Sequence, residues 1–140
     1  MNRELRVVFD TGVIVSAALL PDSVPRRALE HALAQGTLLL SEPIVLELNE
    51  VFRRRKFDKY VDQARRLEFL ATLIREATLL DVTASVTDCR DPKDNKFLEL
   101  ALSSFATHVV SSDQDLLVLH PFRGISIVTP KTFLSVADNE

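Results

Sequence analysis

The sequence predicts an α/β fold in which a central, mostly parallel sheet of about five strands has helices on both faces. Short apolar runs alternate with longer amphipathic segments along the chain, which is the pattern of consecutive strand–helix–strand units. The runs are continuously apolar, as expected for strands that are covered on both faces. No internal repeat or break in composition marks a boundary, so we expect a single domain over residues 1–140.

Turn and capping residues divide the first half of the chain into separate elements. Asp10 ends the first apolar run, Pro21 stops the helix that follows it, and Gly36 closes the next helix. A Ser-Glu-Pro sequence at 41–43 then opens a further helix. The expected elements are a strand over 5–9, helices over 13–20 and 25–34, a strand over 37–40 and a helix from 41 to about 54.

The second half alternates in the same way. Apolar residues at helical spacing predict a helix over 61–76, and a short apolar run at 78–82 predicts a third strand. Asp91 and Pro92 have the order of an N-cap and a first helical residue, which predicts a helix from there to about Phe105. The last expected elements are strands over 107–110 and 125–128 and a short helix from 131.

Composition places the chain among ordinary globular proteins of the cytoplasm. Hydrophobic residues make up 46% and charged residues 26%, close to the globular averages of roughly 45–50% and 25%. The lone Cys89 cannot form an internal disulfide. Residues 1–5 lack the start of a secretion signal, and the longest apolar stretch, 13–20, is far shorter than the ~18 residues of a membrane helix. We therefore expect a cytoplasmic protein that does not associate with membranes.

Positive charge is concentrated in one stretch, the basic segment 53–66. It holds seven basic and two acidic residues, whereas the rest of the chain carries ten basic and eighteen acidic residues. We expect its first residues to attract phosphate groups, principally Arg53, Arg54, Arg55 and Lys56. The alternative interpretation is a solvated helix end, because positive side chains also suit a helix C-terminus.

Four acidic residues are expected to meet at one rim of the sheet. In an open parallel sheet, ligands bind beyond the carboxyl ends of the strands. Asp10 follows the first strand directly and Asp113 follows the fourth. Glu47 lies in the helix after the second strand, and Asp94 lies in the first turn of the helix before the fourth. Glu47 could equally be a solvated helix residue.

Two neighbouring acids complicate the assignment. Asp91 is explained as a helix cap, whereas Asp94 shares a helical face with the apolar stripe that begins at Phe97 and should point toward the sheet. Asp113 and Asp115 lie together in a polar turn that does not by itself decide between them. Asp91 and Asp115 are therefore additional candidates as ligands.

Clustered carboxylates repel one another unless a cation compensates them. Oxygen-only ligands suit Mg²⁺ or Mn²⁺ rather than zinc, and the three histidines show no ligand-like spacing. One or two such ions would polarise a phosphodiester and lower the pKa of a bound water. The acids therefore predict a metal-dependent phosphodiester hydrolase.

Five segments carry a recognisable order of motifs, namely VVFDTGVIVSA at 7–17, LSEP at 40–43 leading to Glu47, CRDPKDNKFL at 89–98, SSDQDLL at 111–117 and GISIVTP at 124–130. Together they resemble the PIN-domain nucleases, and within these the VapC-like toxins of toxin–antitoxin pairs. The resemblance implies a three-layer α/β/α sandwich, a Mg²⁺ or Mn²⁺ site and endoribonuclease activity on RNA. It maps the acidic positions and their supporting hydroxyls onto Asp10, Glu47, Asp94, Asp113, Thr11 and Ser111.

The same resemblance implies an antitoxin and a homodimer. An antitoxin helix would need an apolar groove. Residues 13–20 and the helix around Ala28, Leu29 and Leu33 are candidates for it, and both could equally be core or dimer surface. The sequence departs from the family pattern in two places. Many relatives carry Asn where Gly12 stands, and Asn95 can align with the acid of other PIN groups, so the third ligand is Asp94 or a neighbour. Asp94 is favoured because it is charged and faces inward.

Other classes share single features of the sequence. Asp10, Thr11 and Gly12 match the signature of retroviral-type aspartic proteases, but those are β-rich dimers. Phosphotransfer folds also place Asp after the first strand, although the haloacid-dehalogenase type needs a second Asp at position 12. Within the PIN resemblance, the alternatives are a housekeeping RNA-processing nuclease and a catalytically silent module that binds RNA or a protein partner. A metal-dependent cleavage assay distinguishes a nuclease from a silent module.

Overall fold

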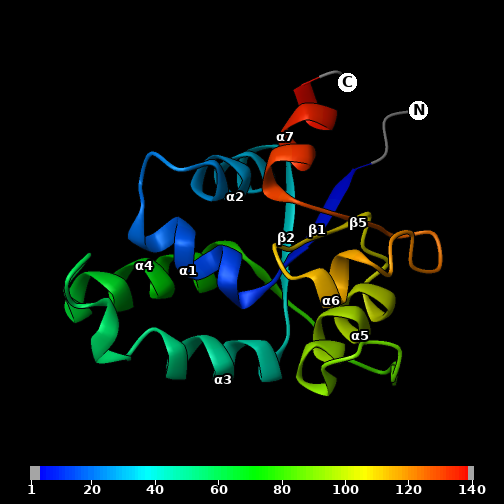
Figure 1. Cartoon of the computed structure of the whole chain (residues 1–140), viewed down its shortest axis with the longest axis horizontal. Coiled ribbons are helices and arrows are strands. Elements are labelled where there is room, and N and C mark those ends of the chain that lie inside the picture. The colour runs from blue at the N-terminus through cyan, green and yellow to red at the C-terminus, as the bar shows by residue number, and fades with distance from the viewer. Residues whose placement is uncertain (1–3, 139–140) are drawn as a thin grey trace.

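Five strands form one parallel sheet in the structure, a computed structural model that describes residues 4–138 (Figure 1). Across the sheet their order is β3-β2-β1-β4-β5, and each neighbouring pair is parallel. The strands are β1 Leu5–Phe9, β2 Gly36–Leu40, β3 Thr78–Leu79, β4 His108–Val110 and β5 Ser126–Val128. The central parallel sheet predicted from the sequence is therefore confirmed.

Helices cover both faces of this sheet. They are α1 Thr11–Leu19, α2 Val24–Gln35, α3 Glu42–Val51, α4 Gln63–Glu76, α5 Asn95–Ser103, α6 Gln114–Leu117 and α7 Pro130–Asp138, with 3₁₀ turns η1 Arg55–Phe57 and η2 Pro92–Asp94. Strands β2 and β3 lie on one side of β1, and β4 and β5 lie on the other. Connections between parallel strands are right-handed. The β1–β2 and β2–β3 connections, which contain α1 to α4, therefore cross one face of the sheet, and the β3–β4 connection, which contains α5, crosses the other. Helix α7 returns to pack beside α2 (Figure 1).

Strand register aligns the residues that will build the site. Phe9 of β1 pairs with Val110 of β4, and the next backbone N–H, that of Asp10, donates to the carbonyl of Val110 at 3.0 Å. The N–H of Ser111 in turn donates to the carbonyl of Val128 at 2.9 Å. Neighbouring strands therefore end at one level, and the residues that follow them share the carboxyl edge of the sheet.

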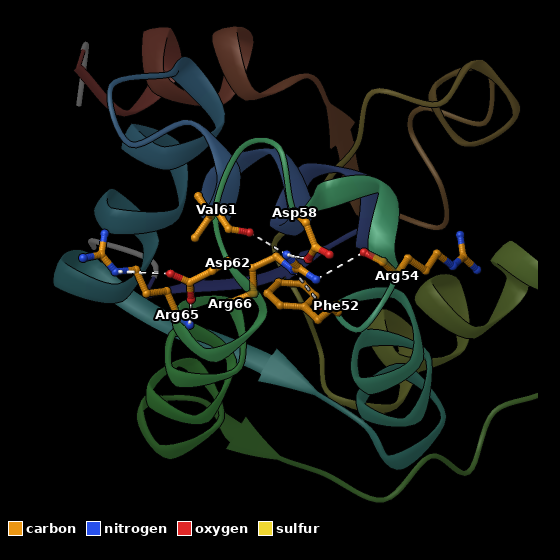
Figure 2. A network of polar contacts seen from close by, with 7 residues as sticks. All are labelled: Phe52, Arg54, Asp58, Val61, Asp62, Arg65 and Arg66. Atoms are coloured by element: carbon orange, nitrogen blue, oxygen red, sulfur yellow. Dashed lines mark hydrogen bonds and ion pairs between the residues drawn. The ribbon is translucent and has the colours of Figure 1, made fainter.

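A buried arginine shapes the turn between α3 and α4 (Figure 2). The Arg66 side chain is 1% exposed, and its guanidinium donates to the carbonyls of Phe52 at 2.9 Å, Arg54 at 3.2 Å and Val61. It also pairs with the carboxylate of Asp58 at 2.9 Å. The turn closes around this group, so α3 ends at Val51, earlier than the position near 54 expected from the sequence.

Three further elements differ from the sequence expectation. The third strand is only two residues long. A 3₁₀ turn precedes α5, which ends at Ser103 because Phe105 adopts a left-handed backbone conformation with φ 56°. The polar turn at Asp113 opens the short helix α6, which the sequence did not predict.

The helices of residues 4–138 include none with the length and apolarity required to cross a membrane. Residues 1–3, on which the expectation about a secretion signal partly rested, lie outside the described residues, as do residues 139–140.

Candidate active site

A cavity of about 240 Å³ lies at the carboxyl edge of the sheet. All four acids singled out from the sequence line it, although they come from separate elements: the end of β1, α3, the start of α5 and the end of β4. The full lining is Asp10, Thr11, Gly12, Glu47, Asp94, Phe97, Ser112 and Asp113. The topology thus joins residues that are about a hundred positions apart in the chain.

Asp10 is the most buried of these acids, with 6% of its surface exposed. It caps α1 by accepting the backbone N–H of Val13 at 2.8 Å on Oδ1. Its Oδ2 accepts the Ser111 hydroxyl and the N–H of Ser112, the latter at 3.3 Å. Burial raises the pKa of Asp10, while these hydrogen bonds lower it in part. Ser111 thus contacts the acid that the family resemblance expects it to support.

Glu47 faces the cavity from α3 and is held on both carboxylate oxygens. The Thr11 hydroxyl donates to Oε1, and the Lys96 ammonium lies 2.8 Å from Oε2. The contact made by Thr11 fits the supporting role expected of it. Lys96 was not foreseen from the sequence, because no local pattern shows that it reaches an acid on another helix.

Asp94 and Asp113 approach each other across the cavity. The pKa of Asp94 is raised from 3.8 to about 7, first by burial and then by the neighbouring Asp113 carboxylate, while the charge of Lys96 lowers it in part. Oδ2 of Asp94 is buried and has no hydrogen-bond partner within residues 4–138. Two ionised carboxylates can only accept hydrogen bonds, so their contact becomes a hydrogen bond only when one of them takes up a proton.

Three other candidates lie outside the cavity lining. Asp91 caps η2 by accepting the N–H of Lys93 at 3.0 Å, as the helix-cap interpretation expected. Asp115 is in α6, where its N–H donates to Asp113. Asn95 is buried and its Oδ1 accepts the N–H of Cys89 at 2.9 Å. Because the Asn95 oxygen is engaged away from the cavity, this geometry favours Asp94 over Asn95 as the third acidic position.

The donor chemistry of the cavity fits a divalent metal ion. Carboxylates and hydroxyls are the oxygen ligands that Mg²⁺ and Mn²⁺ prefer, and the unpartnered Asp94 Oδ2 is a buried acceptor that a cation would satisfy. In residues 4–138, no three His, Cys, Asp or Glu side chains are as close as a bound ion requires. Glu47 instead contacts Lys96 and Thr11. The four acids therefore have the oxygen donors that the ion prefers, but they would have to move closer together to share it.

The exposed cations of the basic segment lie outside this cavity. Arg53, Arg54, Arg55 and Lys56 are all exposed in the turn that follows α3, and Arg54 pairs with Glu50 at 3.1 Å. The same segment includes Arg66, which the sequence interpretation counted among the charges of this basic surface and which is buried instead.

The sequence profile of the PIN domain family matches residues 6–115, a range that contains all four acids of the cavity. The chain belongs to the PIN domain family. PIN domains are generally nucleases, and they typically use divalent metal ions. The predicted family resemblance is thereby confirmed.

Known relatives span nearly the whole chain. The uncharacterized protein MJ1680 of Methanocaldococcus jannaschii is 26% identical over 141 residues, covering 94% of this chain and 90% of MJ1680. PAE2754 from Pyrobaculum aerophilum has a similar structure, with a TM-score of 0.61, 16% identity and coverage of 96% of this chain and 90% of PAE2754. VapBC2 from Rickettsia felis, bound to a DNA fragment from its promoter, has a TM-score of 0.61, 12% identity and coverage of 88% and 97%. At these identities, the structural matches confirm the three-layer fold.

Proposed function

We propose that this protein is a Mg²⁺- or Mn²⁺-dependent endoribonuclease that serves as the toxin of a toxin–antitoxin pair. The observation that carries the proposal is the convergence of Asp10, Glu47, Asp94 and Asp113 on one cavity, with a buried Asp94 oxygen left unpartnered. Clustered carboxylates repel one another, and a divalent cation would relieve that repulsion. Membership of the PIN domain family supports the nuclease class.

The residues of the cavity have separable roles in this proposal. Asp10 is the fixed ligand, because three hydrogen bonds from Ser111, Val13 and Ser112 hold its carboxylate in place. Glu47, Asp94 and Asp113 complete the ligand set. A bound divalent ion would polarise the phosphodiester and activate a water for attack.

The substrate in this proposal is single-stranded or structured RNA, attracted by the cations of the basic segment. These side chains are exposed on the turn that follows α3, the helix that carries Glu47. The hydrogen bonds of Arg66 fix the backbone of that turn (Figure 2). A turn held in one shape presents its cations to phosphates at little further cost in conformational entropy.

The antitoxin in this proposal lays an amphipathic helix into a groove of about 400 Å³ between α2 and α4. Leu29, Leu33, Phe69 and Leu73 supply its apolar lining, and charged side chains share its wall. The sequence had also suggested the stretch 13–20 for such a groove, but Val13, Ile14, Ala17 and Ala18 are buried in the core. The likeness of the fold to VapBC2 supports the toxin role. The homodimer belongs to the same proposal, and light scattering of the purified protein tests it.

The decisive assay is cleavage of a single-stranded RNA by the purified protein with Mg²⁺, with Mn²⁺ and with a chelator. Cleavage should require the metal, spare DNA of the same sequence and disappear in Asp10→Asn. Cleavage that persists in the chelator or in the variant would contradict the assignment of the cavity. No cleavage by the folded, metal-loaded wild type would favour a silent binding module.

The toxin role has a separate test in cells. Expression of the wild type should slow growth, Asp10→Asn should abolish the effect, and a small protein encoded beside it should restore growth. Harmless expression of a protein that cleaves RNA in vitro would favour a housekeeping RNA-processing nuclease.

A further inference from the structure

Lys96 places a positive charge against the wall of the acidic cavity. It lies in the first turn of α5, and its Nζ reaches α3 to lie 2.8 Å from Oε2 of Glu47. The Lys96 side chain is 16% exposed and that of Glu47 is 29% exposed, so water screens this pair only in part. The Lys96 ammonium also donates to the backbone carbonyl of Lys93. These two contacts fix the position of the charge.

The distribution of partners among the four acids is uneven. Both oxygens of Glu47 are engaged, one by Thr11 and one by Lys96, whereas Oδ2 of Asp94 is buried without a partner. With all four carboxylates ionised, the acids and Lys96 together carry a net charge of −3. Glu47 is the acid whose charge is already balanced from within the protein.

We propose that Lys96 is a positioning residue that acts as an internal counter-cation, holding Glu47 while no metal is bound and competing with a divalent ion for that carboxylate. This inference rests on the proposed metal site. A metal ion that engages Glu47 must displace or share the ion pair with Lys96, so part of the binding free energy is lost in breaking it. The pair therefore lowers the affinity for the metal ion. In the metal-free protein it also supplies Glu47 with a paired counter-charge, which the other three acids lack within residues 4–138.

Removal of the ammonium should tighten metal binding. Lys96→Met removes one positive charge beside the acids and frees Glu47. Mn²⁺, measured by calorimetry, should therefore bind on the order of tenfold more tightly. The metal-free variant should melt at a lower temperature than the wild type, and the rise in melting temperature caused by Mn²⁺ should be larger. Lys96→Gln provides a second neutral variant if the first folds poorly, and Lys96→Arg should retain nearly wild-type affinity.

The matched control is Lys93→Met. It removes the same charge three residues away, from an exposed side chain in η2, and should change the affinity much less. A merely structural role for Lys96 would weaken metal binding instead of tightening it.

Glu47→Gln shows whether Lys96 acts through Glu47. In that background the effect of Lys96→Met on Mn²⁺ affinity should largely vanish, because there is no carboxylate to compete for. An undiminished effect would show that Lys96 acts through overall charge and would overturn the inference. So would equal or weaker affinity in Lys96→Met when the wild type binds Mn²⁺. If neither the wild type nor any variant bound Mn²⁺, the proposed metal site would be overturned, and so would the proposed competition between Lys96 and the metal ion.

Discussion

Loss of the proton from Asp94 should make the metal-free protein less stable as the pH rises. Its pKa is 3.8 in the unfolded chain and about 7 in the fold. Between these values the folded state binds more protons than the unfolded state, so stability falls with increasing pH. The contribution of Asp94 is fully present below pH 3.8 and is lost as the pH passes through about 7.

The magnitude follows from the size of the shift. A change from 3.8 to about 7 corresponds to about 4 kcal/mol in a fully shielded site. The cavity opens to solvent, which screens the interaction, so we expect about 1–2 kcal/mol between pH 4 and pH 8. Asp94→Asn removes the titrating group and should remove this part of the pH dependence. Asp10 titrates in both proteins, so the difference between them isolates Asp94.

The assay is urea denaturation of the wild type and Asp94→Asn in chelator at several pH values. The free energy of unfolding of the wild type should fall relative to that of the variant as the pH rises. Saturating Mg²⁺ should reverse the trend for the wild type, because metal binding favours the deprotonated carboxylates. Parallel curves for the two proteins in chelator would refute the assignment of a raised pKa to Asp94.

Three further predictions concern other parts of the molecule. Arg66→Met should lower the free energy of unfolding by about 1–3 kcal/mol, because the backbone carbonyls that accept from the guanidinium lose their donor. The control is the exposed neighbour in Arg65→Met, and similar losses in both variants would contradict this account. Phe105→Gly should stabilise the protein by about 0.5–1 kcal/mol, because the backbone φ of Phe105 is 56° and the residue is 82% exposed. A lower melting temperature would show that the ring has a structural role. Arg55→Ala in an Asp10→Asn background should reduce the slope of log affinity for RNA against log salt concentration by about one unit. The control is Arg75→Ala in the same background, and equal slopes in the two variants would show that RNA does not contact Arg55.

Patterns confined to neighbouring residues were sufficient to predict the sheet and the acids at its edge. The apolar run is interrupted at Asp10, a charged group that needs a partner when it is buried, and that break places the acid at the carboxyl end of β1. Once the strands were placed, the rule for parallel sheets brought Asp113 and Asp94 to the same edge. The cavity lining shows this juxtaposition.

Contacts between distant residues were beyond the reach of such patterns. In the sequence, Arg66 resembles the other surface charges. In the structure it is buried, and its guanidinium donates to backbone carbonyls more than ten residues earlier, in the turn where α3 ends. The pairing of Lys96 with Glu47 joins two helices whose relative placement depends on the whole sheet. The left-handed conformation of Phe105 was also not predictable, because residues with a β-carbon rarely adopt a positive φ.

The central claim is that the four acids form one shared metal site, and calorimetric titration with Mn²⁺ tests it most directly. The wild type should bind Mn²⁺, and Asp94→Asn and Asp113→Asn should each bind it at least tenfold more weakly, a difference of about 1.4 kcal/mol or more. Each variant loses a ligand while the fold is retained, which circular dichroism can verify. Equal affinities in all three proteins, or no binding by the wild type, would contradict the claim.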